Sequence, residues 1–287
     1  MDDPSRGQRE VAMVIPEERL PPGFAESVGT PVALPAATQP AATVVLMRDG
    51  DNGVEVLLLK RHRASGFVPG AYVFAGGRID DSDGDAQLLA MLGTMPPDPA
   101  GPYWIGGIRE VFEETGVLIA VDHNGRSCHG SLNPDVIRDM RESLMNESAT
   151  LLDMMRRHGL RPDTNALAYV AHWITPVAEP RRYDTRFFLA AMPPECEATA
   201  DAREMSDAKW LTPSDALARF KAGDLPMVFP TVKTLQALLR HGTVEAALAV
   251  ARRSPVKPIL PRLERVPGGV GIVIDADDAP QTEVSRD

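Results

Sequence analysis

Three glutamates close together are the first feature of the chain that could do chemistry. Glu110, Glu113 and Glu114 fall within one face of a helix at 100° per residue. Carboxylates about 6 Å apart repel one another by on the order of 1–3 kcal/mol at an effective dielectric constant of 20–80. A divalent cation reverses this penalty, and carboxylate oxygens are the ligands that Mg²⁺ and Mn²⁺ prefer. A solvated acidic helix face has the same pattern, so the surrounding sequence must decide.

A double glycine lies upstream of these glutamates. Gly76 and Gly77 follow the short apolar segment 72–74, which predicts a strand, and acidic residues come directly after them, among them Asp83. Paired glycines allow the backbone to turn tightly and to approach a ligand. The segment therefore predicts a turn that brings main-chain atoms close to a bound group.

Together the two segments resemble the signature of the Nudix hydrolase family, which runs Gly, five residues, Glu, seven residues, then Arg-Glu-apolar-x-Glu-Glu-x-Gly-apolar. The second half matches at every defined position from Arg109 to Val117. The first half matches at Gly77, with Asp83 where the family has Glu. Between Asp83 and Arg109 lie 25 residues instead of seven, an insertion of 18 residues. A surface loop absorbs such an insertion at small entropic cost.

Segments outside the signature resemble one branch of this family. Residues 57–61 and 70–77 are similar to the region that precedes the signature in coenzyme A diphosphatases. The interrupted signature, with residues 173–176 and 180–188, is similar to the branch whose signature is split in the same way. Gly66 stands where the coenzyme A motif has an arginine.

The resemblance implies roles for particular residues. It implies that Glu110, Glu113 and Glu114, with the backbone carbonyl of Gly77, bind one to three Mg²⁺ or Mn²⁺ ions. Arg109 is expected to orient a carboxylate through an ion pair, and the general base is expected to be Glu114 or Glu204. The planar fork of arginine suits phosphate oxygens. The residues expected at the substrate are Arg61, Arg63, Gly77 and Arg182.

The reaction that the resemblance implies is metal-dependent hydrolysis of a diphosphate bond in a nucleoside diphosphate linked to a second group. Coenzyme A or acyl-coenzyme A is the leading substrate, with ADP-ribose, a nucleotide sugar or a dinucleoside polyphosphate as alternatives. A non-catalytic nucleotide-binding domain is a further alternative. Such domains usually lose one of the helix glutamates, and this chain keeps all three.

The elements that must position these residues are read from the apolar patterns. Residues 41–47 and 54–59 predict a hairpin whose turn, 49–53, is longer than two residues, and residues 104–115 predict a helix ended by Gly116. Further strands are expected at 117–121, 167–174, 185–191 and 208–211. One short helix is expected at 86–92, one or two helices at 133–158, one helix that starts at 212–215, and two more at 230–240 and 244–252. This mixture indicates an α/β (α+β) class. The resemblance makes it a Nudix fold, a mixed β-sheet sandwiched between helices, with a helical insertion.

Three regions are expected along the chain. Residues 1–40 are rich in proline and predict an extended arm. Residues 41–254 are expected to form the Nudix hydrolase domain, with insertions at about 84–102 and 133–160, and residues 255–287 a C-terminal extension.

Composition limits the partners. A net charge of -10 argues against a non-specific nucleic-acid binder, and no apolar run is long enough to cross a membrane. Two cysteines cannot make a disulfide framework, and the N-terminus shows no secretory signal. We therefore expect a cytoplasmic protein that binds a small-molecule nucleotide substrate. The resemblance also allows a homodimer.

Overall fold

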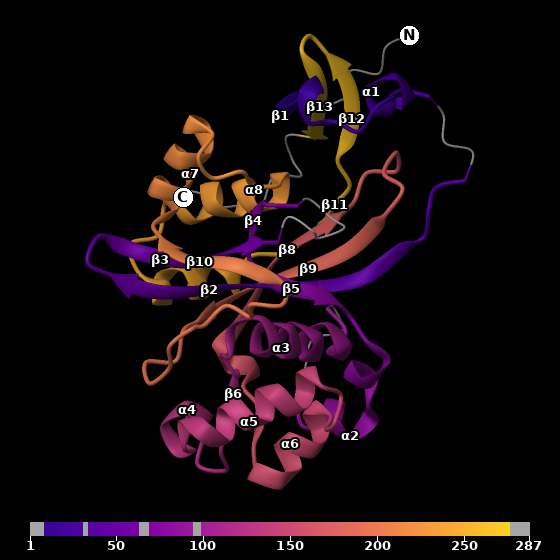
Figure 1. Cartoon of the computed structure of the whole chain (residues 1–287). Helices are drawn as coiled ribbons and strands as arrows, with labels where there is room; N and C mark the ends of the chain where they lie inside the picture. Colours follow the sequence, from indigo (N-terminus) through magenta and orange to yellow (C-terminus); the bar gives the residue numbers. More distant parts are fainter. Residues whose placement is uncertain (1–8, 31–33, 63–68, 94–98, 276–287) are drawn as a thin grey trace.

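A mixed eight-stranded sheet lies at the centre of the chain (Figure 1). The computed structural model describes residues 9–30, 34–62, 69–93 and 99–275. Along the sheet the order is β10-β3-β2-β9-β8-β11, with β4 paired to β3 and β5 paired to β2. Its strands are β2 (Thr38–Gly50), β3 (Gly53–Arg61), β4 (Tyr72–Val73), β5 (Ala75–Arg78), β8 (Leu167–Ile174), β9 (Arg182–Ala191), β10 (Met205–Leu211) and β11 (Pro258–Ile259).

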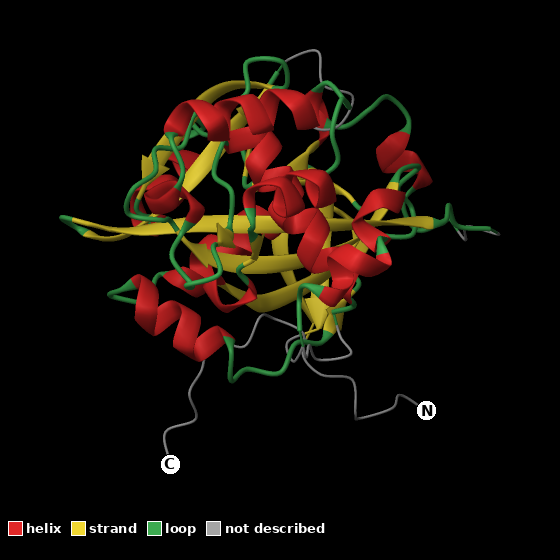
Figure 2. Ribbon diagram, turned by 90° about the horizontal axis from the view of Figure 1, so that it is seen from below, coloured by secondary structure: helices red, strands yellow, loops and turns green. Residues whose placement is uncertain are grey.

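The sheet is buried on both faces, as the alternation along β2 shows. Val44 and Leu46 point into one apolar core and Val45 and Met47 into the other, because successive side chains of a strand face opposite ways. The first core is completed by α2 (Ala86–Ala90), α3 (Gly101–Thr115), α4 (Cys128–Ser131), α5 (Pro134–Met145) and α6 (Leu151–His158). The second is completed by α7 (Pro213–Ala222), α8 (Phe229–Leu238) and α9 (Val244–Ala251). Figure 2, seen from the side of α3, shows helices lying across the strands. The predicted sandwich of a mixed sheet between helices is confirmed.

The hairpin of β2 and β3 is confirmed, but the expected long turn is wrong. Gly50 pairs with Gly53, so only Asp51 and Asn52 connect the strands. The two strands remain paired through the polar residues at their ends. A prediction from apolar residues alone ends each strand too early.

The expected strand at 117–121 is shortened to β6 (Ala120–Val121), which pairs with β7 (Arg161–Pro162). The preceding residues are buried, but the backbone of Leu118 is hydrogen-bonded to side chains and not to a neighbouring strand. The amide of Leu118 donates to His129 Nε2 at 3.0 Å, and Cys128 Sγ donates to its carbonyl at 3.3 Å. An apolar run therefore predicts burial, but it does not show whether the backbone pairs with another strand or with nearby side chains.

The two ends of the chain meet in a second sheet, here called the terminal sheet. It contains β1 (Arg9–Pro16), β13 (Gly269–Asp275) and β12 (Arg262–Val266) in the order β1-β13-β12, and α1 (Phe24–Ser27) follows β1. The segment expected as an extended arm is extended over β1, but it is paired along β13. Its partner lies at the other end of the chain, where no local pattern could reveal it.

Within the described residues, no helix is long and apolar enough to cross a membrane.

Candidate active site

The glutamates lie on α3, and the ends of this helix follow from its sequence. Pro102 occupies the first turn, where a missing amide costs nothing, and Gly116 ends the helix with a φ of 74°. The helix begins at Gly101, three residues before the expected start. Ile105, Ile108 and Phe112 are fully buried against the sheet. This burial fixes the rotation of the helix, and it turns Glu110, Glu113 and Glu114 toward β5.

Strand β5 meets that face of α3 at the double glycine. The turn predicted at Gly76 and Gly77 is therefore wrong, because both residues lie within a strand that pairs with β2. A Cβ on Gly76 would lie 2.3 Å from the carbonyl oxygen of Ala42, and a Cβ on Gly77 would lie 2.5 Å from Oε1 of Glu110. The amide of Gly76 donates to Oε2 of Glu114 at 2.9 Å. Gly76 therefore requires glycine because fixed backbone atoms leave no room for a side chain, whereas a side chain at Gly77 would displace the carboxylate of Glu110.

Arg109 joins the two halves of the split signature. Its guanidinium donates to Oδ1 and Oδ2 of the buried Asp83 at 2.9 and 3.0 Å, and to the carbonyl oxygen of Arg78 at 2.8 Å. Nη1 lies between Oε1 of Glu110 and Oε2 of Glu113, at 3.0 Å from each. Asp83 thus takes the place of the glutamate expected at this point of the signature. The insertion after it, which includes α2, does not disrupt the ion pair between Asp83 and Arg109.

Burial raises the pKa of the helix carboxylates. The pKa of Glu110 rises to about 7 through burial, against the opposing charge of Arg109, with Glu113 and Glu204 adding to the rise. Burial and then the charge of Glu110 raise the pKa of Glu114 well above its ordinary value. Burial also raises the pKa of Glu113. One arginine therefore leaves part of the negative charge uncompensated.

This donor set fits a divalent cation by its chemistry. Glu110 and Glu114 both contact the double glycine of β5, their charge is only partly compensated, and carboxylate and carbonyl oxygens suit Mg²⁺ and Mn²⁺. Among the residues that the structure describes, no group of three or more Asp, Glu, His or Cys side chains is already arranged around one ion position. In this arrangement the guanidinium of Arg109 occupies the space between Glu110 and Glu113.

Glu204 reaches the site from the loop before β10. Its side chain is exposed at the same cleft, and its carbonyl oxygen accepts from the amide of His62 at 3.0 Å. The loop is hydrogen-bonded to the end of α3. Thr199 N donates to Thr115 O at 2.8 Å, and Asp201 N donates to Glu114 O at 2.9 Å.

Arg141 of α5 is a residue that the sequence did not single out. Its Nε and Nη2 donate to the carbonyl oxygen of Glu113 at 2.9 and 2.8 Å, and Nη2 also donates to Thr199 O at 3.1 Å. The side chain therefore ties the helical insertion to the end of α3 and to the Glu204 loop. No signal in the sequence separates it from the exposed arginines of the same insertion.

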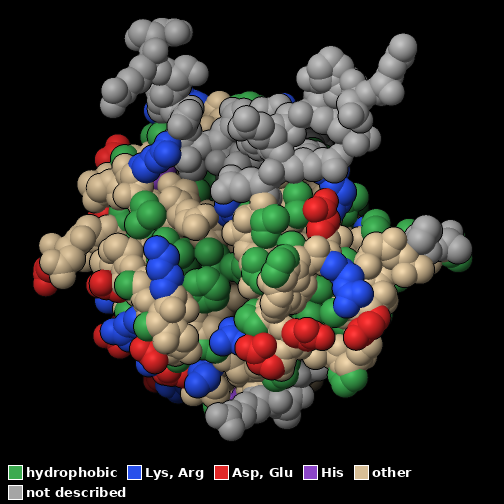
Figure 3. All heavy atoms as spheres, turned by 90° about the horizontal axis from the view of Figure 1, so that it is seen from above, with side chains coloured by type: hydrophobic (Ala, Val, Ile, Leu, Met, Phe, Trp, Pro, Cys, Tyr) green, Lys and Arg blue, Asp and Glu red, His purple; other side chains and the backbone are tan. Residues whose placement is uncertain are grey.

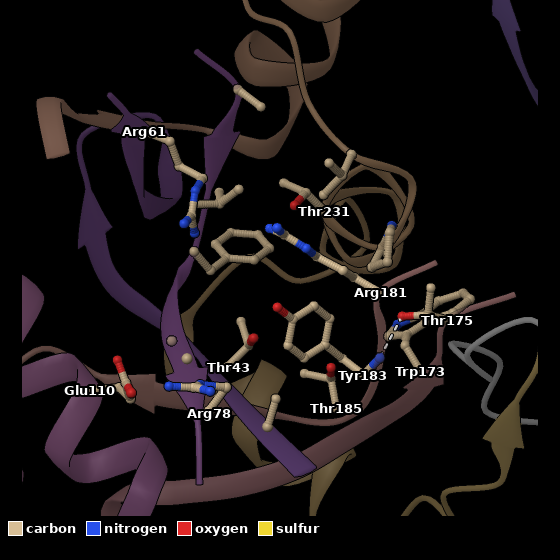
Figure 4. Close-up of a pocket in the computed structure, with 18 of the residues that line it drawn as sticks. Thr43, Arg61, Arg78, Glu110, Trp173, Thr175, Arg181, Tyr183, Thr185 and Thr231 are labelled. Carbon is tan, nitrogen blue, oxygen red and sulfur yellow. Dashed lines mark hydrogen bonds between the residues drawn. The ribbon is translucent and has the colours of Figure 1, made fainter. Parts of the chain in front are cut away.

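A cleft of about 1660 Å³ opens over this site. The predicted residues that line it are Arg61, Gly77, Arg109, Glu110, Glu113, Glu114 and Glu204. Figure 4 shows the guanidinium groups of Arg61 and Arg181 pointing toward each other across the cleft, above Glu110 and Thr43.

Two predicted substrate residues are not brought to the cleft by the described structure. Arg182 donates instead to the carbonyl oxygens of Thr175 and Ala36, at 3.1 and 2.9 Å, and holds the chain before β2. Arg181 lines the cleft in its place, because neighbouring residues of an extended segment point to opposite sides. Arg63 lies outside the described residues.

The fold and the site together define a Nudix domain: a mixed sheet between helices, with the glutamate helix against a double-glycine strand. A family model described as the NUDT19 Nudix domain matches residues 92–238. The chain therefore belongs to the Nudix hydrolase family, in the branch of the NUDT19 Nudix domain.

Individual relatives agree with this assignment. The chain is 30% identical to the acyl-coenzyme A diphosphatase NUDT19 of Gallus gallus, over 61% of this chain and 58% of the relative. It is 27% identical to that of Xenopus laevis, over 64% of this chain and 59% of the relative. The chain thus spans less than two thirds of the length of these relatives. A crystal structure of a NUDIX hydrolase from Alicyclobacillus acidocaldarius matches with a TM-score of 0.64 and 29% identity, covering 77% of this chain and 99% of that one.

Proposed function

We propose that this chain hydrolyses the diphosphate bond of coenzyme A or an acyl-coenzyme A. The observation that carries the proposal is the meeting of three helix carboxylates, the double glycine of β5 and two arginines at one cleft. The names of the relatives favour this substrate over ADP-ribose, a nucleotide sugar or a dinucleoside polyphosphate.

In this proposal, Glu110, Glu113, Glu114 and the carbonyl oxygen of Gly77 hold Mg²⁺ or Mn²⁺. A bound divalent ion would supply neutralisation of the diphosphate charge and activation of a water molecule. Arg109 keeps its contact with Asp83 and sets the positions of the two carboxylates that it touches. It acts as a positioning residue and does not contact the reacting atoms.

Arg61 and Arg181 bind the diphosphate oxygens from the opposite wall of the cleft. A guanidinium can donate two parallel hydrogen bonds to phosphate oxygens, which fixes the orientation of the group to be cleaved. Their charge also offsets the repulsion between an anionic substrate and an acidic site.

Glu204 is the general base that the geometry favours over Glu114. Its carboxylate is exposed at the cleft, where a water molecule can reach it. Glu114 is buried, and its Oε2 already accepts a hydrogen bond from Gly76. Removal of a proton from the attacking water requires a carboxylate within hydrogen-bond reach of it.

The test is a substrate panel of coenzyme A, acetyl-coenzyme A, ADP-ribose, NADH and a dinucleoside tetraphosphate, each with Mg²⁺ or Mn²⁺. Mass spectrometry should find 3′,5′-ADP and 4′-phosphopantetheine from coenzyme A. Glu113→Gln should abolish turnover, whereas Glu142→Gln, the same change on an exposed part of α5, should not. Cleavage of ADP-ribose, NADH or the dinucleoside tetraphosphate, with coenzyme A and acetyl-coenzyme A left intact, would overturn the proposed substrate. Binding that persists in chelator, without turnover in either metal, would point to the non-catalytic alternative.

A further inference from the structure

The cleft does not end at the diphosphate site. It continues past Tyr183 and Arg181 into a region that we call the apolar arm of the cleft. This arm is lined by Trp173 and Phe229 of the central fold and by Met13, Ile15, Leu263 and Ile272 of the terminal sheet. Figure 4 shows the order from Glu110, through Thr43 and Tyr183, to Trp173. One continuous space therefore joins the carboxylates to an apolar wall.

The arm has a rigid floor. Trp173 and Phe229 are 3% and 5% exposed, and their rings meet edge to face with centroids 5.5 Å apart. Ile272 is buried in the same core. Closely packed aromatic side chains hold one shape, so this floor gives the arm a fixed boundary, and the surface that a ligand can cover lies on the other wall.

The opposite wall keeps surface that a ligand can cover. Met13, Ile15 and Leu263 pack against the second core but are only partly buried. In Figure 3, which looks onto this side of the molecule, hydrophobic side chains gather in the middle of the face, with Lys and Arg side chains beside them. An apolar ligand that covers such side chains removes their surface from water, and this makes the free energy of binding more favourable.

The size of the cleft fits a long ligand. Its volume of about 1660 Å³ exceeds the range of about 300–1,000 Å³ that is common for pockets holding one small ligand. The phosphates and ribose of a nucleoside diphosphate are charged or polar and do not need an apolar wall, and a single base can cover only part of one by stacking. The remaining space suits an extended group that is attached to the far side of the diphosphate and ends in hydrocarbon.

We propose that the apolar arm binds the acyl chain of a fatty acyl-coenzyme A thioester, so that the two ends of the polypeptide set the preference for acylated over free coenzyme A. This inference rests on the proposed function. It adds to that function the chemical class of the group that is attached to the far side of the diphosphate. Burial of each methylene favours binding by about fourfold. A chain that fills the arm therefore gives a preference that rises with its length.

The experiment measures kcat/KM for coenzyme A and for its acetyl, hexanoyl and decanoyl thioesters, below their micelle concentrations. We expect kcat/KM to rise by about tenfold or more from acetyl to decanoyl. Met13→Glu should lower kcat/KM for decanoyl-coenzyme A by about tenfold more than for coenzyme A, because the charge must be desolvated by the chain. Val11→Glu is the matched control, since Val11 is 44% exposed on the same strand and does not line the cleft.

A second variant and a binding measurement keep the proposal falsifiable. If Met13→Glu does not fold, as judged by circular dichroism, Leu263→Ala removes apolar surface without adding charge and should reduce the preference by about threefold. A series with no dependence on chain length, or an equal loss in Met13→Glu and Val11→Glu, overturns the proposal while the proposed function stands.

Failure of the proposed function is recognised separately. If coenzyme A and its thioesters are not cleaved, calorimetry with the Glu113→Gln variant compares the binding of decanoyl-coenzyme A and coenzyme A. Tighter binding of the decanoyl ester would then support the apolar arm, although the reaction assigned to the site is wrong. Equal binding would overturn the arm as well.

Discussion

The two ends of the cleft are built in different ways. At the carboxylate end, the guanidinium of Arg109 donates five hydrogen bonds to carboxylate and carbonyl oxygens. At the apolar arm, the wall consists of Met13, Ile15 and Leu263, whose apolar side chains make no hydrogen bonds. The first region comes from the two halves of the split signature. The second is assembled from the strands nearest to the two ends of the described chain. The difference indicates that a polar network with one geometry positions the carboxylates, whereas the apolar surface tolerates changes of shape.

Loss of one glutamate should have the largest effect and should separate the two regions. Glu113→Gln removes a carboxylate charge that the proposed metal site needs, and we expect kcat to fall by about 10²–10³-fold or more. The ratio of affinities for decanoyl-coenzyme A and coenzyme A should stay the same, because Glu113 is at the other end of the cleft. Steady-state kinetics and calorimetry measure the two quantities. A change in that ratio would show that the regions are coupled.

Removal of the carboxylate behind Arg109 should destabilise the fold. Asp83 is 1% exposed, and Asp83→Ala leaves the buried guanidinium without its bidentate partner. Breaking a buried ion pair in this way costs about 3–5 kcal/mol. Denaturant unfolding should show this loss, whereas Asp81→Ala, an exposed neighbour on the same turn, should change the free energy of unfolding by less than about 0.5 kcal/mol. Equal stability of the two variants would contradict the structural role given to Asp83.

Arg141 offers a sharper test of how the catalytic end is positioned. Arg141→Met keeps the apolar stem but removes the hydrogen bonds to the end of α3 and to the Glu204 loop. We expect kcat to fall by about tenfold with KM almost unchanged, since a misplaced base slows the reaction without weakening binding. Arg138→Met, on the exposed face of the same helix, is the control. A larger change in KM than in kcat would assign Arg141 to binding.

The sequence predicted the catalytic end well and the apolar arm not at all. The resemblance to the family signature implied that Glu110 and Gly77 act together, and the structure places them side by side in spite of the insertion between the two halves. The sequence could not choose between Arg181 and Arg182, since the direction of a side chain depends on the register of β9 with β2. Pairing of β1 with β13 is set by contacts between distant segments, which leave no periodic signal in either one.

The smallest expected effect is a dependence of the stability of the fold on pH, and it arises from Glu110. Burial raises the pKa of Glu110 to about 7, above its value in the unfolded chain, so the folded protein binds more protons between about pH 4.5 and 7. Stability of the metal-free protein that depends on Glu110 is therefore present at low pH and is lost as the pH rises through about 7.

The Glu110→Gln variant lacks this titrating carboxyl group. Comparing wild type with the variant at each pH cancels the contributions of the other titrating groups to stability. In chelator, the difference in Tm between wild type and Glu110→Gln should move in favour of wild type by about 2–4 °C when the pH falls from 8 to 5. Saturating Mg²⁺ should reduce that movement, because a cation that binds the carboxylate competes with the proton. Between pH 6 and 8 the Tm of Met13→Glu should stay parallel to that of wild type, because both keep Glu110 and an accessible glutamate titrates below that range. A Tm difference between wild type and Glu110→Gln that does not change with pH would mean that Glu110 is not the titrating group.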